Sequence, residues 1–154
     1  AFWQRARIAL PNAQVRDSRY LMWRFGQSPF PFKVLVARVA GEVVGYAVTL
    51  TIRHAGEGAF SHTILLDWLY DPSGEQESGA ALLSATMKLA IADKSDVVSA
   101  VACTTDVLKL PFARFGFLRR KREMSIVVHS NPAGRELLDD PSSWHFTLSD
   151  TDAF

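Results

Sequence analysis

Residues that favour β-structure are concentrated in three runs in the first half of the chain. The first two runs, residues 34–40 and 43–52, flank a Gly-Glu dipeptide, and the third covers residues 61–70. Two such runs around a tight glycine-containing turn are typical of a β-hairpin. We therefore expect a three-stranded antiparallel meander, in which Gly45 marks a bulge or a close approach of another backbone.

Helical patterns lie on both sides of this meander. Before it, residues 2–10 can form one short helix closed by Pro11, and Asp17 provides an N-cap for a second helix that ends at Gly26. After it, residues 79–92 carry an apolar stripe wide enough for a helix that lies on a sheet.

The second half of the chain continues with shorter elements. An apolar strand is expected at residues 97–103, and the short crossover that precedes it implies that it runs parallel to the strand at 61–70. Residues 104–106 can cap a further helix, which Pro111 should split or kink before Gly116. Two final strands are predicted at residues 119–129 and 144–148, with a helical turn between them at residues 134–138.

The composition is that of an ordinary globular protein, with 48% hydrophobic and 21% charged residues in 154 positions. We expect a single domain over residues 1–154, which begins without Met and therefore suits a domain excised from a longer protein. The net charge of +1 gives no electrostatic argument for nucleic acid or an anionic membrane. A single cysteine, the lack of a signal peptide and the lack of a long apolar run together indicate a cytoplasmic protein.

Several polar residues have simple structural interpretations. Cys103 lacks a recognisable histidine partner, so we expect a small buried residue rather than a nucleophile. The basic cluster Arg119–Arg122 resembles a nucleic-acid patch, but in a strand its side chains would alternate between faces. Asp150 and Asp152 could attract a cationic amine or belong to a solvated tail. We expect no metal site, because metal-ligand spacing is absent from the four histidines, His54, His62, His129 and His145.

The stretch from Ile64 to Ile91 has the order strand, polar loop, helix. Such a junction can bind an anion, because the first N–H groups of a helix have no intrahelical acceptor and carry the positive end of the helix dipole. The loop sequence Gln76–Ala81 fits the pattern Q/R-x-x-G-x-G/A, in which small residues let a phosphate approach the backbone. An ordinary strand-to-helix loop with a glycine near its N-cap is the alternative.

This pattern resembles the pyrophosphate-binding loop of the GNAT acetyltransferases. Other phrases agree in order and spacing over roughly residues 15–150, namely AGEVVGYAVTL, LLDWLYDP, KLPFARFGFLRR and WHFTLSDTD. The resemblance implies an α/β (α+β type) fold: a mixed, mostly antiparallel sheet with a central parallel strand pair, flanked by helices. It also implies acetyl-CoA as cosubstrate. The residues it assigns to acetyl-CoA are those of the strand end, the loop and two later positions: Trp68, Leu69, Tyr70, Gln76, Glu77, Ser78, Gly79, Ala80, Ala81, Thr105 and Phe112.

The chain departs from the family pattern in ways that bear on catalysis. Phe112 stands where many members have a tyrosine that protonates the departing thiolate, and Thr105 stands where an asparagine is common. Gln76 replaces the more usual arginine. The strand that normally precedes the first helices is missing, which predicts an unpaired sheet edge and hence a homodimer or dependence on a preceding segment.

Asp67 is the candidate catalytic base. It lies in an otherwise apolar run, where alternation would place it on one face with Leu65 and Leu69. A buried carboxylate is costly unless it is paired or functional, and a raised pKa would suit a base that deprotonates an alkylammonium. The alternative is a structural carboxylate paired with a nearby arginine.

We therefore expect an acetyl-CoA-dependent N-acetyltransferase that moves an acetyl group to a primary amine by direct attack. The acceptor, a small molecule or a peptide, is left open by the sequence. The alternative is a degenerate, non-catalytic GNAT domain that binds CoA or another protein.

Overall fold

The structure is a computed structural model, which describes residues 2–10, 12–72, 77–103, 108–120, 140 and 143–151. Its first elements confirm the predicted pair of N-terminal helical segments. α1 (Phe2–Ala6) runs into the 3-10 helix η1 (Arg7–Ala9), and α2 (Ser18–Leu21) continues as the π-helical turn η2 (Met22–Gly26). The side chain of Asp17 accepts a hydrogen bond from the Tyr20 N–H at 2.8 Å, as expected of an N-cap.

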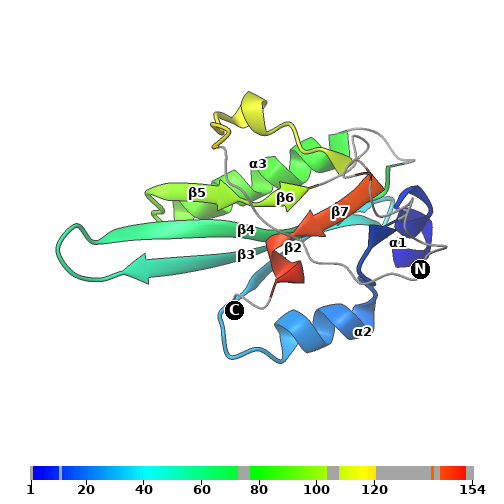
Figure 1. Cartoon of the computed structure of the whole chain (residues 1–154), viewed down its shortest axis with the longest axis horizontal. Helices are drawn as coiled ribbons and strands as arrows, with labels where there is room; N and C mark the ends of the chain where they lie inside the picture. Colours follow the sequence, from blue (N-terminus) through cyan, green and yellow to red (C-terminus); the bar gives the residue numbers. More distant parts are fainter. Residues whose placement is uncertain are drawn as a thin grey trace.

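The predicted meander is confirmed as part of a four-stranded sheet. It consists of β2 (Lys33–Val39), β3 (Glu42–His54), β4 (Phe60–Tyr70) and β5 (Val97–Ala100), in the order β2-β3-β4-β5. β2 and β4 each pair antiparallel with β3, while β5 runs parallel to β4. Figure 1 shows β3 and β4 as the long central strands of the molecule. The mixed sheet of the predicted fold class is thus present.

A second, smaller sheet was not predicted. It has the order β1-β7-β6, with β1 (Asn12–Ala13), β6 (Ala102–Cys103) and β7 (Trp144–Thr147). The single strand expected at 97–103 is therefore divided at Val101, because its first part pairs with β4 and its last part with β7. β7 confirms the strand expected at 144–148. The helical turn predicted at 134–138 and most of the strand predicted at 119–129 lie outside the described residues.

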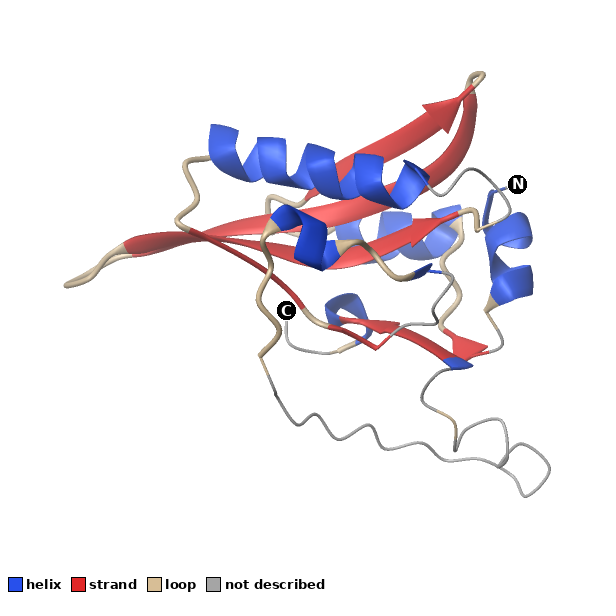
Figure 2. Cartoon of the chain, turned by 90° about the horizontal axis from the view of Figure 1, so that it is seen from above, coloured by secondary structure: helices blue, strands red, loops and turns tan. Residues whose placement is uncertain are grey.

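The helices cover both faces of the larger sheet. α3 (Glu77–Ala92) lies across one face, in contact with β2, β3 and β4, and Figure 2 shows it in front of the sheet with α2 behind. Its buried residues recur at helical spacing, which explains why this segment folds onto a sheet. They are Gly79, Leu82, Leu83, Thr86 and Ala90. Between Leu108 and Gly116 the main helical element is the short 3-10 helix η4 (Phe112–Phe115), which begins directly after Pro111.

Two irregularities in the sheet position the residues discussed below. Gly45 lies at a register shift between β2 and β3, and a Cβ there would lie 2.9 Å from the Tyr70 Cβ, so the close approach predicted at this glycine is confirmed. A second shift between β3 and β4 pairs Leu65 with Thr49 and Asp67 with Val48, which leaves Leu66 as an extra residue. The shift breaks the predicted alternation, so Leu65 does not share a face with Asp67.

Candidate functional site

The ladder between β4 and β5 ends halfway along β4. The two strands pair from His62 to Leu65, and β4 then continues to Tyr70 while the chain beyond Ala100 turns to β7. Within the described strands, none pairs with this outer edge of β4 beyond Leu65. The predicted pantetheine-binding residues Trp68, Leu69 and Tyr70 therefore lie where a strand edge leaves its neighbour.

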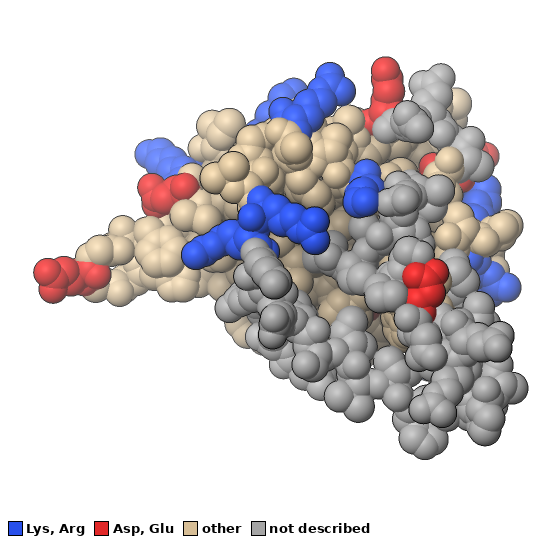
Figure 3. Space-filling model, turned by 45° about the horizontal axis from the view of Figure 1, so that its top comes forward, with Lys and Arg blue, Asp and Glu red and all other residues tan. Residues whose placement is uncertain are grey.

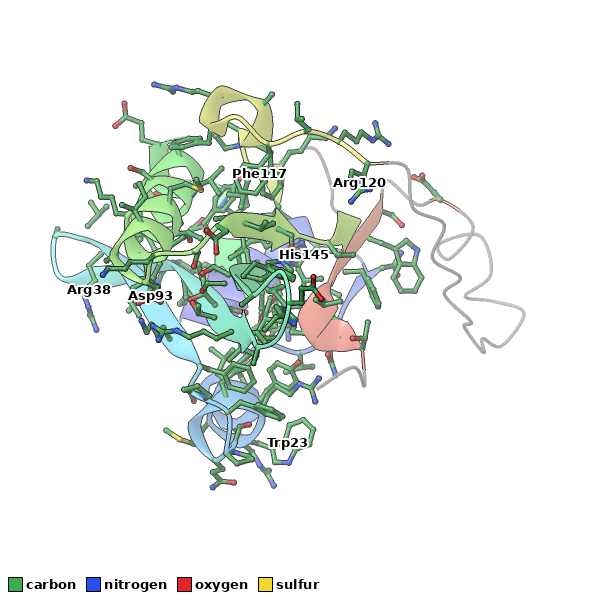
Figure 4. All side chains as sticks on the ribbon, turned by 90° about the vertical axis from the view of Figure 1, so that its left-hand side faces the viewer. Trp23, Arg38, Asp93, Phe117, Arg120 and His145 are labelled. Atoms are coloured by element: carbon green, nitrogen blue, oxygen red, sulfur yellow. The ribbon has the colours of Figure 1, made fainter. Side chains whose placement is uncertain are left out.

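The side chain of His145 contacts this outer edge of β4. The Nε2 of His145 in β7 lies 2.9 Å from the backbone carbonyl oxygen of Trp68, and Figure 4 shows His145 near the centre of the molecule. Burial, aided by the nearby Arg16 guanidinium, lowers the pKa of His145 to about 4. The neutral ring therefore donates its Nε2 proton to the carbonyl, because a carbonyl oxygen can only accept. His145 is a satisfied polar group, and its place at the β4 edge was not predicted.

The direction of this bond orients the rest of the edge. Successive residues of a strand point their backbone groups to opposite sides. Since the Trp68 carbonyl faces His145, the backbone groups of Trp68 and Tyr70 point to the outer side of β4, and those of Leu69 point to β3. The Asp71 N–H donates to the Val44 carbonyl at 2.8 Å, which fits this alternation.

α3 begins shortly after this strand end. Its first residue is Glu77, and Ser78, Gly79, Ala80 and Ala81 form its first turns, whereas Gln76 lies outside the described residues. Gly79 is buried, and a Cβ there would lie 3.0 Å from Cε1 of Tyr70 and 3.2 Å from Cδ2 of Leu110. Close packing of α3 on the strand end therefore favours a glycine here, a reason independent of phosphate approach.

Asp67 is held in a buried ion pair. Its side chain and that of Arg16 are both 0% exposed, and the Arg16 Nε lies 3.1 Å from Oδ1 and 3.3 Å from Oδ2. The Tyr46 hydroxyl donates to Oδ2 at 2.7 Å, and the Thr147 hydroxyl donates to Oδ1 at 2.9 Å. Both oxygens of Asp67 are thus engaged. This is the paired carboxylate that the sequence left open as the alternative to a base, and the base role stays a prediction.

A second carboxylate shares the same arginine. Nη2 of Arg16 lies 2.5 Å from Oδ2 of Asp150, which also accepts from the Thr147 N–H at 2.8 Å. Oδ1 of Asp150 is buried and has no hydrogen-bond partner among the described residues. Asp150 thus belongs to the core of this cluster rather than to a solvated tail. Neither Arg16 nor this role of Asp150 was predicted, because the two residues are brought together only by the fold.

The environment of the cluster shifts the pKa values of Asp150, Arg16 and Tyr46. Burial raises the pKa of Asp150, although the adjacent Arg16 guanidinium opposes the shift. Burial alone would lower the pKa of Arg16, but Asp67 and Asp150 more than offset this and raise it. The pKa of Tyr46 is raised well above its ordinary value by burial and by the charge of Asp67. The cluster therefore holds one arginine cation between carboxylates, with Tyr46 neutral.

The two later predicted positions differ in what the structure describes. Phe112 packs edge-to-face on Trp68 and on Phe117, with ring centroids 5.7 Å and 5.1 Å apart, so it belongs to an aromatic cluster beside the open edge. Thr105 lies outside the described residues. Phe112 carries no hydroxyl and supplies no proton there.

On the face shown in Figure 3, the described Lys and Arg side chains lie in several groups, with Asp and Glu side chains mainly toward its margins. No group of three or more metal-binding side chains is found among the described residues. In the same part of the chain, no helix combines the length and the apolar character that crossing a membrane requires.

Comparisons with known proteins identify the fold. The chain is similar to an aminoglycoside acetyltransferase from an uncultured soil metagenomic sample, with 20% identity, 84% of each chain covered and a TM-score of 0.55. It is similar to a GNAT family acetyltransferase of Staphylococcus aureus at 9% identity, over 71% of this chain and 74% of that one, with a TM-score of 0.51. A transcriptional regulator from Bacillus halodurans gives 13% identity, 71% and 74% coverage and a TM-score of 0.54.

The chain therefore has a GNAT-like fold, as its sequence predicted. No protein-family model matches the sequence, and no curated protein matches it either. At these identities the likeness defines the architecture and leaves the activity to be argued from the site.

Proposed function

We propose that the chain is an acetyl-CoA-dependent N-acetyltransferase, which transfers an acetyl group to a primary amine of a small molecule or peptide by direct attack on the thioester. One observation carries the proposal. The open edge of β4 ends at Tyr70, and the first turn of α3 begins at Glu77, so a strand edge and a helix N-terminus lie in succession. A ligand with an amide-bearing arm and a pyrophosphate can pair with the first and place its anion at the second.

Different residues would bind the pantetheine arm and the pyrophosphate of acetyl-CoA. The backbone groups of Trp68 point to the outer edge of β4, with which no described strand pairs beyond Leu65, and would pair with the pantetheine amides. The N–H groups of Ser78, Gly79 and Ala80 would face the pyrophosphate. His145 would have to release the Trp68 carbonyl if a pantetheine amide is to use it, since both would donate to the same oxygen.

The reaction also requires a proton acceptor. An alkylammonium with a pKa of about 10.4 costs about 4 to 5 kcal/mol to deprotonate at pH 7. Asp67 and Asp150 are the candidates, and the geometry favours Asp150, because its Oδ1 is unpartnered among the described residues while both oxygens of Asp67 accept hydrogen bonds. We assign Asp67 the role of orienting Arg16, which in turn holds Asp150.

Calorimetry with acetyl-CoA tests the binding step. Ser78→Asp adds a negative charge in the first turn of α3, which favours the helix through its dipole and repels a phosphate. We expect this variant to bind acetyl-CoA about tenfold or more weakly than wild type, with its thermal unfolding unchanged. Ile91→Asp, at an exposed position in the last turn of the same helix, is the matched control and should bind normally. The proposal fails if wild type gives no heat with acetyl-CoA or CoA at millimolar concentration.

Thiol release with a panel of amines tests the chemical step. Asp150→Asn should lower turnover by about 10²–10⁴-fold and leave CoA affinity almost unchanged. Asp67→Asn should instead reduce stability and binding together, because it removes a buried charge that Arg16 needs. If Asp67→Asn stays as stable as wild type and loses only turnover, then Asp67 is the base and the assignment to Asp150 is wrong.

A non-catalytic CoA-binding or protein-binding domain is the second candidate. Phe112 offers no proton to a departing thiolate, and the Trp68 carbonyl is already bonded to His145. Heat with acetyl-CoA but no thiol release with any amine tested would support this candidate over the enzyme.

A further inference from the structure

The imidazole ring of His145 lies against the outer edge of β4, where the pantetheine arm of acetyl-CoA would pair. Its Nε2 is 2.9 Å from the Trp68 carbonyl oxygen, and no described strand pairs with this edge beyond Leu65. His145 is only 1% exposed, and its ring packs edge-on against the Trp68 ring with centroids 6.0 Å apart. The ring therefore fills the part of the edge that the proposed function assigns to a ligand.

The position of the ring excludes a pairing chain. In a ladder, the donor nitrogen of the incoming chain lies about 2.9 Å from the carbonyl oxygen, and its backbone lies about 4.8 Å from the strand. Nε2 of His145 takes the place of that nitrogen, and the ring atoms beyond it take the place of the backbone. A carbonyl oxygen can accept two hydrogen bonds, but a second donor from the same side would overlap the ring.

The strand that carries His145 is fixed, so the side chain is the part that can move. His145 pairs with Ala13 of β1, and Thr147 pairs with Ala102 of β6. The Thr147 hydroxyl also donates to Oδ1 of Asp67 at 2.9 Å. A rotation about the side-chain torsions of His145 breaks the bond to Trp68 and leaves β7 in place.

The buried ring is neutral because of its surroundings. Burial lowers the pKa of His145 to about 4, the Arg16 guanidinium acts in the same direction, and the Asp67 carboxylate opposes both. Among the described residues these two charges act on the ring, one from the segment after β1 and one from β4. In water the ordinary pKa of 6.5 returns, so between about pH 4 and 6.5 a ring that leaves the edge gains a proton.

We propose that His145 is a gate of the proposed CoA site, whose ring must leave the edge of β4 before acetyl-CoA can bind. The inference rests on the proposed function and adds regulation by pH to the same site. Because the displaced ring binds a proton that the buried ring does not, acid favours the open state, and acetyl-CoA binds more tightly as pH falls through 6.5. Above this pH, opening gains no proton, and the closed state reduces the apparent affinity.

Calorimetry with acetyl-CoA at about pH 7.5 and about pH 5.5 tests the proton linkage. We expect wild type to bind about tenfold more tightly at the lower pH, relative to the change seen in His145→Gln. Repeating the titration in buffers of different ionisation enthalpy should show uptake of about 0.9 proton per bound ligand at the lower pH. His145→Gln is the matched control, because it keeps a donor for the Trp68 carbonyl and has no titrating ring. The phosphates of the ligand and Asp150 titrate in both proteins, so the difference reports His145.

Removing the ring tests the gate directly. His145→Ala should bind acetyl-CoA about two- to tenfold more tightly than wild type at about pH 7.5, because opening no longer breaks a hydrogen bond. Phe146→Ala removes a half-buried ring from the opposite side of β7 and should leave the affinity unchanged. If His145→Ala does not fold, the proton linkage of wild type against His145→Gln still decides.

The outcomes separate the gate from the proposed function. Equal pH dependence in wild type and His145→Gln, or weaker binding by His145→Ala, overturns the gate and leaves the proposed function standing. Binding by His145→Ala alone would support a gate that stays closed in wild type. Absence of binding in both proteins at both pH values overturns the gate and the proposed function together.

Discussion

Asp67 and Trp68 are neighbours on β4 and are both completely buried, yet they are held by different forces. Asp67 takes part in an ion pair with Arg16 and accepts hydrogen bonds from Tyr46 and Thr147. Trp68 packs against the rings of Phe112 and His145, and the only polar atom of its side chain, Nε1, donates to the Leu108 carbonyl at 3.3 Å. Equal burial therefore conceals unequal tolerance to substitution.

The difference predicts how substitutions at Trp68 and at Asp67 should affect the stability of the fold. At Trp68, whose ring has mainly apolar contacts, a smaller ring loses packing contacts in proportion to the atoms removed. On the polar side, removing one partner leaves the others buried without compensation, which costs more than the lost bond. Replacing the whole pair with apolar side chains can cost little, because desolvation of both charges is then avoided.

The largest expected effect is loss of Asp67 alone. Asp67→Ala should lower the free energy of unfolding by about 3–5 kcal/mol, because Arg16 stays buried without its main counter-charge. Urea or thermal unfolding measures the change. The triple variant Arg16→Met, Asp67→Leu, Asp150→Asn should recover part of the loss, because it leaves no charge of this cluster buried without its partner. A triple variant as unstable as Asp67→Ala would show that Arg16 matters for packing and would contradict the comparison with Trp68.

An intermediate effect on the free energy of unfolding is expected from protonation of His145, whose ring donates to the Trp68 carbonyl. Its pKa is lowered from 6.5 to about 4 in the folded chain, so the unfolded chain binds a proton more readily. Stability is therefore fully present above pH 6.5 and falls as pH decreases to about 4, by roughly 3 kcal/mol. Asp150, whose pKa is raised by burial, opposes part of this loss at acid pH.

Unfolding at a series of pH values checks the expectation. His145→Gln keeps a donor near the Trp68 carbonyl and removes the titrating ring, so it should flatten the curve between pH 6.5 and 4. A wild-type curve that is already flat there would mean that His145 does not stay neutral in the folded chain.

The smallest effect is expected from Trp68→Phe. The variant keeps an aromatic ring beside Phe112 and removes one ring and the bond to Leu108, so unfolding should become easier by only about 1–2 kcal/mol. A loss of unfolding free energy equal to that of Asp67→Ala would contradict the proposed difference between Trp68 and Asp67. Thermal unfolding beside wild type is sufficient to decide.

Much of the fold could be predicted from local patterns. The hairpin around Gly41, the parallel return of β5 and the helix over residues 77–92 depend on turn chemistry and periodicity within one segment. The second sheet could not be predicted in the same way. β1 has two residues and its partner β7 lies more than 130 positions away, so no local pattern marks it.

The candidate site likewise has one part that local sequence patterns predict and another part that they do not. The strand end at Tyr70 and a helix that starts near Gly79 follow from the order strand, loop, helix, and the structure begins this helix two residues earlier, at Glu77. The partners of Asp67 do not, because Arg16 and Asp150 come from opposite ends of the chain and meet only after folding. The bulge at Leu66 is also invisible in the sequence, since it arises from the register with β3.

Tyr70 lies between two glycines, Gly45 from the sheet and Gly79 from α3. A Cβ on the first would lie 2.9 Å from the Tyr70 Cβ, and a Cβ on the second would lie 3.0 Å from its ring. The two glycines consequently differ in mutational epistasis. A methyl group gained at Gly79 can be matched by volume given up in the ring at residue 70, whereas one gained at Gly45 meets the Tyr70 Cβ and the Leu69 carbonyl oxygen, which remain with any side chain at residue 70 except that of glycine. An evolutionary path that enlarges position 79 is therefore ordered, with the tyrosine replaced first, while position 45 is closed to such a path.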